Sequence, residues 1–141
     1  MKLKLLLALL VVGLVSCNDT TTPDGIVRSA GQALSKGEDQ KFLSYLSDDL
    51  RDQMKKGTAL TDLKTALSQF AELKVEKPKL NMTDKKGNEF YSVDVLGKLA
   101  SGEWRISINT GVMCWLERVD TYDKDRIIDY YYVRFCKITE I

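Results

Sequence analysis

The chain has 141 residues, of which 21 are basic, 20 are acidic and none is histidine. The balanced charge gives no electrostatic case for nucleic-acid binding. The missing histidine excludes Ser-His and Cys-His nucleophiles, a histidine general base and the usual two-histidine metal sites. An enzyme with this composition would have to use carboxylates, lysine or tyrosine, and no cofactor is expected.

The first sixteen residues have the pattern of a secretory signal peptide. Lys2 and Lys4 form a short positive region, and residues 5–14 form an uncharged apolar run. A run of this length fits a signal-peptide core and is too short for a membrane span, which needs about 20 apolar residues. Nothing later in the chain repeats it, so we expect no transmembrane helix in the mature protein.

The signal peptide ends in Leu14-Val15-Ser16-Cys17, which resembles the lipobox of bacterial lipoproteins. The resemblance implies a diacylglycerol on the Cys17 sulfur, cleavage before Cys17 and acylation of the new amino group, so that palmitate would label the protein. Two or three acyl chains make a lasting membrane anchor, because each buried methylene contributes about 0.8 kcal/mol. An ordinary signal peptide with a chance cysteine is the alternative.

This interpretation divides the chain into a signal peptide at 1–16, a lipidated tether at 17–23 and a single α+β domain at 24–141. Residues 1–16 hold two lysines and no acidic residue, so the remaining 125 residues carry 19 basic and 20 acidic side chains. That length suffices for one hydrophobic core. Asn18 follows the cysteine and Asp19 comes second. We therefore expect the outer membrane, facing the periplasm, rather than the inner membrane.

The first half of the mature chain predicts four short amphipathic helices. Apolar residues recur at three- and four-residue spacing, most clearly from Ile26 to Leu34. Each helix is too short to be stable alone and needs a partner surface. The expected caps and stops, in chain order, are Asp24, Gly37, Asp39, Ser47, Gly57 and Thr61.

The second half changes to the two-residue period of β-strands, with short turns that imply antiparallel pairing. Pro78 marks an edge or a break in the first of these strands. A bend or bulge is expected at Thr110-Gly111, and a loop at 120–125. The expected strands span 73–82, 90–99, 104–108, 112–119 and 127–138.

Helices followed by a strand meander predict an α+β fold, with the helices on one face of a curved antiparallel sheet of four to five strands. The segment from Ile26 to Leu50, IVRSAGQALSKGEDQKFLSYLSDDL, resembles small bacterial lipoproteins of the nuclear-transport-factor-two-like (cystatin-like roll) superfamily. The resemblance implies a helix-backed, strongly bent sheet that forms a cone. In that superfamily the cone is a ligand pocket, an active site or simply a packed core, so the fold does not settle the function.

Cys114 and Cys136 remain once Cys17 is assigned to lipid, and an even pair in an oxidising compartment favours a disulfide. Two cysteines without histidine do not close a zinc site, so no metal is expected. A cross-strand disulfide sets the register of the last hairpin and places Trp115 opposite Phe135. The face that carries these two aromatic residues is the more apolar, so we expect it against the helices and the disulfide on the outer side.

On that register Glu117 and Tyr131 face the core. A carboxylate in an apolar cone has a raised pKa and can act as an acid or base. Glu117 and Tyr131 are therefore the candidate catalytic residues of a small enzyme. The alternative is a structural carboxylate that pairs with a basic residue or lies at the open rim.

The run Tyr130-Tyr131-Tyr132 is conspicuous, because successive side chains in a strand point to opposite faces and at least one tyrosine must face outward. Tyr130 and Tyr132, together with Trp104, are candidates for a contact surface. Ordinary strand packing is the alternative. The nearby acidic residues lack the glycine and terminal glutamate of a calcium loop and indicate a solvated hairpin tip.

These observations predict a lipid-anchored cell-envelope protein that is a non-enzymatic binding or accessory module. Its expected partners are the membrane, through the lipid, and an envelope protein or small ligand; an inhibitor or exclusion lipoprotein is a special case. The first alternative is a small enzyme that uses a carboxylate and a tyrosine in a cone-shaped pocket. The second is an envelope component without a specific ligand.

Overall fold

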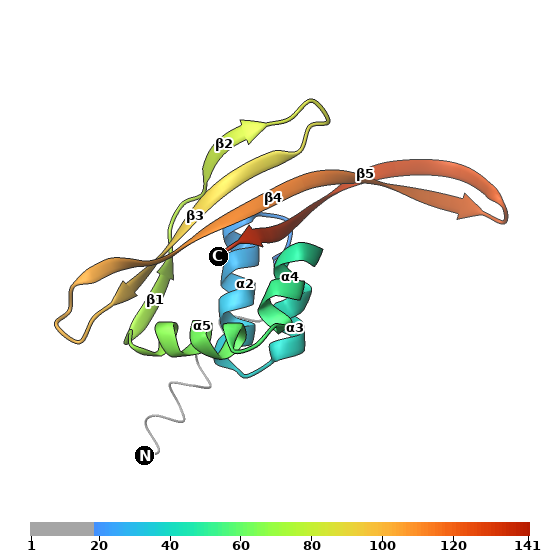
Figure 1. The fold of residues 1–141 in the computed structure, drawn as a ribbon. Coiled ribbons are helices and arrows are strands. Elements are labelled where there is room, and N and C mark those ends of the chain that lie inside the picture. The colour runs from blue at the N-terminus through green and yellow to red at the C-terminus, as the bar shows by residue number, and fades with distance from the viewer. Residues whose placement is uncertain (1–18) are drawn as a thin grey trace, which may run out of the picture.

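The computed structural model describes residues 19–141, which form four helices followed by five strands. This order confirms the predicted α+β class, with the helices gathered on one side of a curved antiparallel sheet (Figure 1). The expected signal peptide and Cys17 lie outside the described residues. The elements are α2 (Pro23–Ser35), α3 (Asp39–Ser44), α4 (Asp48–Lys55), α5 (Ala59–Ser68), β1 (Glu72–Val75), β2 (Lys79–Thr83), β3 (Glu89–Lys98), β4 (Trp104–Asp123) and β5 (Arg126–Glu140).

Two of the described helices, α2 and α4, begin at hydroxyl side chains that satisfy free backbone N–H groups. The Thr22 hydroxyl accepts from the Gly25 N–H of α2, and the Ser47 hydroxyl accepts from the Leu50 N–H of α4. Ser47 is the predicted cap. The predicted cap Asp24 is wrong by two residues, because Pro23 occupies the first turn, where its missing N–H is tolerated.

Two further helix ends predicted from the sequence can be compared with the structure. Gly37 adopts a positive φ of 73° directly after α2, as the predicted C-terminal stop requires. The predicted start of the last helix at Thr61 is wrong, because α5 already begins at Ala59 with Thr58 before it. Thr58 donates to the Asp62 carboxylate rather than capping a backbone N–H.

The sheet has the order β1-β3-β4-β5, and β2 lies beside the first half of β3. β1 and β2 run along the same edge of β3, with β1 opposite residues 95–98 and β2 opposite residues 89–92. They form the predicted first strand in two pieces, and the interruption includes Pro78, as expected. All the strand pairs in the described part of the chain are antiparallel.

β4 joins two of the predicted strands into one strand of 20 residues. The expected irregularity at Thr110-Gly111 is a register shift against β5 between Gly111 and Val112, and the strand continues through it. The loop expected at 120–125 is also shorter than predicted, since pairing continues to Asp123 opposite Arg126. A long, tightly closed hairpin therefore replaces two shorter strands and an open loop.

The β4–β5 register agrees with the prediction, and a disulfide joins Cys114 to Cys136 with a Cα–Cα distance of 4.1 Å. The predicted orientation is wrong. Cys114 and Cys136 are buried in the core together with Val112 and Ile138 on the same face, whereas Trp115 is only half-buried on the other. The helices cover only the base of the hairpin, and there the cysteine face carries the aliphatic residues.

The core lies between this sheet face and the first three helices. It is centred on completely buried aliphatic side chains from α2, the segment after α3, and β3 to β5. Leu46 has no exposed surface and forms an isolated bridge to Ile138. The largest fully buried side chains are Ile26, Leu46, Ile138, Val93, Val112 and Cys114.

The free edge of β5 is covered at its base by two separate segments. The Thr20 carbonyl accepts from the Cys136 N–H at 3.0 Å. Further along, Ile138 donates its N–H to Tyr45 and accepts from the Ser47 N–H, at 3.0 and 2.8 Å. The second half of the expected tether is therefore bound to the sheet rather than extended from it.

Asp19 fixes the start of this N-terminal segment. Its carboxylate accepts from the N–H and hydroxyl of Thr21 and from the hydroxyl of Thr22. The hydrogen bonds from Thr21 hold the pKa of Asp19 below its usual range. None of the helices in residues 19–141 is long and apolar enough to cross a membrane.

Candidate functional site

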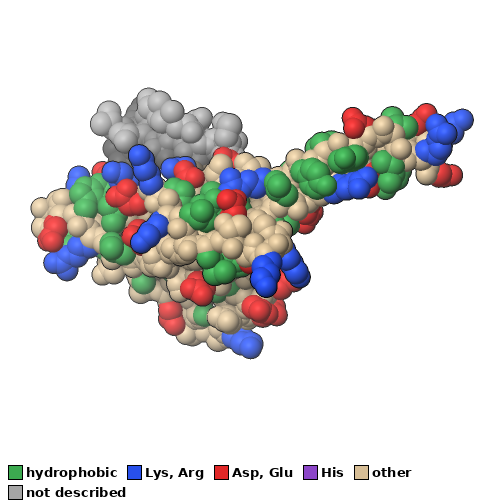
Figure 2. Space-filling view, turned by 90° about the horizontal axis from the view of Figure 1, so that it is seen from above, with side chains coloured by type: hydrophobic (Ala, Val, Ile, Leu, Met, Phe, Trp, Pro, Cys, Tyr) green, Lys and Arg blue, Asp and Glu red, His purple; other side chains and the backbone are tan. Residues whose placement is uncertain are grey.

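The outer half of the β4–β5 hairpin projects from the body of the protein, and we call residues 116–134 the arm (Figures 1 and 2). β3 pairs with β4 only as far as Glu89 opposite Cys114, so within the described chain the arm is a ribbon of two strands. From Leu116 to Asp123 such a ribbon extends about 24 Å, at about 3.4 Å per residue.

The arm exposes large apolar and aromatic side chains along its whole length. Seven of them have at least half of their surface exposed. Figure 2 shows these apolar side chains along the arm, with charged side chains between them and at the tip. The seven are Leu116, Tyr122, Ile127, Ile128, Tyr130, Tyr131 and Tyr132.

One face of the arm carries an ordered group of aromatic and charged side chains, which we call the tyrosine face: Arg118, Asp120, Tyr130 and Tyr132. The Tyr130 and Tyr132 rings meet edge to face at 6.0 Å. The Arg118 guanidinium lies 4.2 Å from the Tyr130 ring centre, and its Nε donates to Asp120 at 2.7 Å. These contacts hold the two rings in place although both are more than half exposed.

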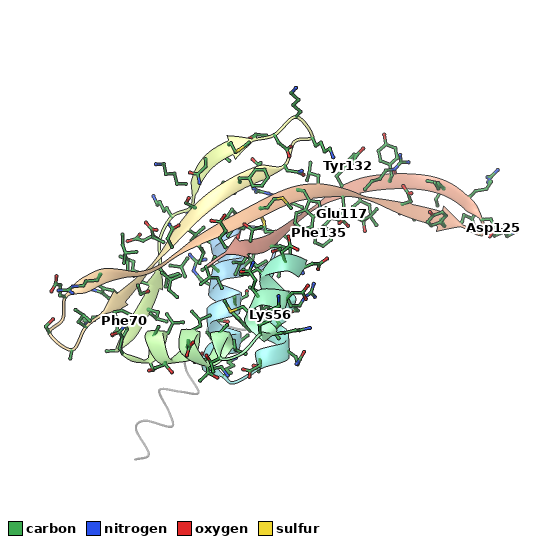
Figure 3. The ribbon with its side chains drawn as sticks, in the orientation of Figure 1. Lys56, Phe70, Glu117, Asp125, Tyr132 and Phe135 are labelled. Atoms are coloured by element: carbon green, nitrogen blue, oxygen red, sulfur yellow. A yellow bond between two sulfur atoms is a disulfide. The ribbon has the colours of Figure 1, made fainter. Side chains whose placement is uncertain are left out.

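The candidate catalytic residues Glu117 and Tyr131 lie on the opposite face of the arm. The predicted core-facing position is wrong for both: Glu117 is exposed and Tyr131 is 55% exposed. The Glu117 carboxylate accepts from the Trp115 indole N–H at 2.9 Å. Figure 3 places Glu117 on the ribbon outside the body, so this carboxylate is not in an apolar cone.

The third aromatic candidate for a contact surface, Trp104, is far from the tyrosine face. It begins β4, while Tyr130 and Tyr132 pair with the outer part of the same strand. Trp104 is 39% exposed, and Lys98 lies 5.8 Å from its ring centre. The structure therefore brings Tyr130 and Tyr132 together and leaves Trp104 outside their surface.

Arg134 connects the base of the arm to β3. Its Nη2 donates to the Glu89 carboxylate and to the Tyr91 hydroxyl, both at 2.8 Å. The guanidinium also lies 5.7 Å from the Tyr91 ring centre. Together with the disulfide, this cluster fixes the point where the arm leaves the body.

A separate feature is a groove of about 1140 Å³ between α2, α5, β1 and the concave face of the sheet. Its walls are mainly apolar, which is typical of small-molecule sites. Phe70 belongs to the lining, and its ring lies so close to Gly97 that any side chain at position 97 would collide with it. The apolar lining includes Val27, Ala30, Leu34, Phe42, Leu63, Leu67, Phe70, Val75, Val95, Ile108 and Ile138.

The groove does not contain the carboxylate–tyrosine pair that the enzyme alternative needs. Its lining includes one carboxylate, Glu72 on β1, and no tyrosine. Within residues 19–141 no group of three or more histidine, cysteine, aspartate or glutamate side chains is arranged to hold a metal ion. The acidic residues at the arm tip belong to the exposed hairpin end.

Three comparisons with known proteins gave no relatives: no family model matches the chain, and neither a curated protein nor a solved structure matches it. The site must therefore be interpreted from its own geometry.

The sequence leaves open whether the cone is a pocket or a packed core, and the residues that line the groove were not identified from it. The last predicted helix has apolar residues on one side, and we expected this side to need a partner surface. In the structure α5 has no fully buried residue, and Leu63 and Leu67 both pack against the core and line the groove. The sequence of an amphipathic helix does not show by itself whether its apolar side is fully covered.

Proposed function

We propose that this chain is a lipid-anchored cell-envelope protein whose mature domain is a non-enzymatic binding module. The arm is its contact surface for another envelope protein. The observation that carries this proposal is the arm itself, a two-stranded ribbon outside the core with seven large apolar or aromatic side chains at least half exposed. Exposed apolar patches of this kind mark interaction sites on soluble domains.

The physical state of the arm supports a role in binding. Isolated two-stranded ribbons are only marginally stable in water, and they gain stability when a third strand or a packed surface covers them. Both edges of the arm also carry unpaired backbone groups, to which an extended segment of a partner can add as a strand. A partner that covers the arm would therefore form hydrogen bonds with its unpaired backbone groups and bury its exposed side chains at the same time.

The composition of the tyrosine face supports a protein partner. Tyrosine and arginine are enriched among the residues that dominate binding energy at protein interfaces. Tyr130 and Tyr132 are already ordered by their edge-to-face contact and by Arg118. Because these rings are partly fixed before binding, less side-chain entropy is lost on association.

The lipid anchor, the outer-membrane location and membership of the nuclear-transport-factor-two-like superfamily are parts of the proposal that rest on the sequence. The same arm could serve an inhibitor or exclusion lipoprotein, since such a protein acts by covering a surface of its target. The enzyme alternative loses its candidate site, because Glu117 and Tyr131 lie on the exposed arm.

The anchor is tested by Cys17→Ser. The variant should lose labelling by palmitate and move from the membrane fraction to the soluble fraction. A matched Cys114→Ser variant should keep both properties, because its cysteine is held in the disulfide. Unchanged membrane partitioning of Cys17→Ser would contradict the lipoprotein proposal.

The arm is tested by photo-crosslinking in living cells. A photoreactive amino acid replaces Tyr132 on the tyrosine face or, as a control, exposed Thr61 on α5. Position 132 should capture one reproducible neighbour, and Arg118→Ala together with Tyr130→Ala should reduce the yield. Equal capture from both positions, or none from position 132, would count against the arm as a contact surface.

A further inference from the structure

We propose that the groove between α5 and the sheet binds a long-chain fatty acid, with its hydrocarbon chain in the apolar interior and its carboxylate beside Lys74. This site is separate from the arm, and the proposal does not depend on the function proposed for the arm.

The interior of the groove accepts only an apolar ligand. Its floor is formed by side chains of β3, β4 and β5, including Val95, Ile108 and Ile138. The buried hydroxyl on this floor belongs to Thr110, and it already donates to the Val93 carbonyl at 2.7 Å. A polar ligand group placed there would lose its water without gaining a partner.

The groove is large enough to hold a hydrocarbon chain. Its volume of about 1140 Å³ exceeds the approximate range of 300–1,000 Å³ that drug-sized ligands occupy. One wall is α5, whose apolar residues Leu63 and Leu67 are only half-buried. A hydrocarbon chain in the groove would cover more of the apolar surface of these residues, which favours binding because apolar surface is removed from water.

The charges at the mouth of the groove specify the head group. Three cations and one carboxylate belong to the lining, namely Arg28, Lys64, Lys74 and Glu72. Arg28 pairs with Asp24 at 2.9 Å, and Lys64 pairs with Asp39 at 2.6 Å.

Among the described residues no carboxylate lies within ion-pair distance of Lys74, which differs in this respect from the other two cations. An ammonium group without an ion-pair partner can bind one negative charge. A long-chain fatty acid combines a single carboxylate with an unbranched apolar chain, and so fits both the mouth and the interior.

The test uses the purified full chain with Cys17→Ser, so that no lipid of its own competes. Fluorescence of cis-parinaric acid, a natural fluorescent fatty acid, reports binding, and palmitate and hexadecanol serve as competitors. We expect saturable binding of one molecule per chain and displacement by palmitate.

Two matched pairs of variants locate the site. Leu67→Trp fills the groove and should weaken cis-parinaric acid binding at least about tenfold, whereas Ala66→Trp on the exposed side of α5 should not. Lys74→Gln should weaken palmitate about threefold to fivefold, as expected for a partly exposed ion pair, and leave hexadecanol unchanged. Lys79→Gln on β2 is exposed and should leave both affinities unchanged.

The proposal is overturned if cis-parinaric acid does not bind saturably, or if Leu67→Trp and Ala66→Trp have equal effects. It is also overturned if Lys74→Gln weakens hexadecanol as much as palmitate. Should Leu67→Trp fail to fold by circular dichroism, Ser35→Trp replaces it, because Ser35 lines the groove and is exposed.

Discussion

The body and the arm are built from the same two strands, yet their side chains have opposite environments. In the body, Val112 on β4 and Ile138 on β5 are 1% and 2% exposed. On the arm, Leu116 and Tyr132 of the same strands and the same face are 64% and 58% exposed. The change takes place within about four residues of each strand.

Neighbouring segments account for this difference. In the body β4 has β3 on its other side, residues 20 and 45–47 cover the edge of β5, and the helices cover one face. Across the described residues the arm has no third strand paired with it and no segment bonded along its edges, and Arg134 at its base contacts β3 through its side chain. The comparison teaches that an alternating apolar pattern marks a strand but does not show what, if anything, covers it.

The sharpest way to test the comparison is to shorten one leucine in each region. Leu46→Ala removes a completely buried side chain and should lower the free energy of unfolding by about 2–5 kcal/mol. Leu116→Ala removes an exposed side chain and should change it by less than about 0.5 kcal/mol. Urea unfolding followed by circular dichroism measures both values.

A loss for Leu116→Ala as large as that for Leu46→Ala would show that the arm is buried in solution. Comparing the two variants in monomeric and associated samples would then identify a second copy of the chain as the covering surface.

The disulfide is the link between the two regions, and its removal should have the next largest effect. The bond closes a loop across 22 residues that contains the whole arm. Replacing Cys114 and Cys136 by alanine should lower the free energy of unfolding by about 3 kcal/mol, because the unfolded chain gains freedom and the core loses packing. The native chain in a reducing agent is the control and should lose a similar amount. Equal stability with and without reductant would contradict this role.

Substitution of Arg134 should have a smaller effect on stability. Compared with a substitution of Arg118, it shows whether side-chain contacts at the base of the arm contribute more than those farther out. Arg134→Gln loses the contacts with Glu89 and Tyr91 and should cost about 1 kcal/mol. Arg118→Gln loses a pair within the arm and should cost less than about 0.5 kcal/mol. Thermal unfolding of both variants gives the comparison, and a larger loss for Arg118→Gln would reverse the proposed order.

Much of the fold could be predicted from local patterns. The helix-to-strand order follows from the change in hydrophobic period, and Ser47 and Gly37 mark helix ends by the chemistry of their own positions. The register of the last hairpin also follows from the sequence, because a disulfide restricts Cys114 and Cys136 to opposite positions.

The orientation of that hairpin could not be predicted in the same way. The comparison of the two faces was dominated by residues such as Trp115 and Tyr131, which lie at the edge of the body or on the arm. Only the few residues near the cysteines meet the helices. In the comparison of the two faces they were outnumbered by residues farther along the strands, which the helices do not cover. For the same reason Glu117 was assigned to an interior that the arm does not have.

The candidate sites depend even more on tertiary structure. The tyrosine face was partly predicted, since Tyr130 and Tyr132 share a face by strand alternation. Whether the cone is open, and which residues line it, could not be predicted, because both depend on how far α5 lies from the sheet, and the local pattern of residues 59–68 does not determine that distance.

The hydrogen bond from Cys136 to Thr20 limits how far the domain can move from a membrane. With Cys17 lipidated as proposed, only two peptide steps separate the lipid from Asp19, a span of about 7 Å. The base of the arm is then held at the head-group layer and can turn about the anchor but cannot rise from it. The arm tip can reach only partners within roughly 45 Å of that anchor. The bilayer therefore sets an upper limit on the height at which a partner can present its surface.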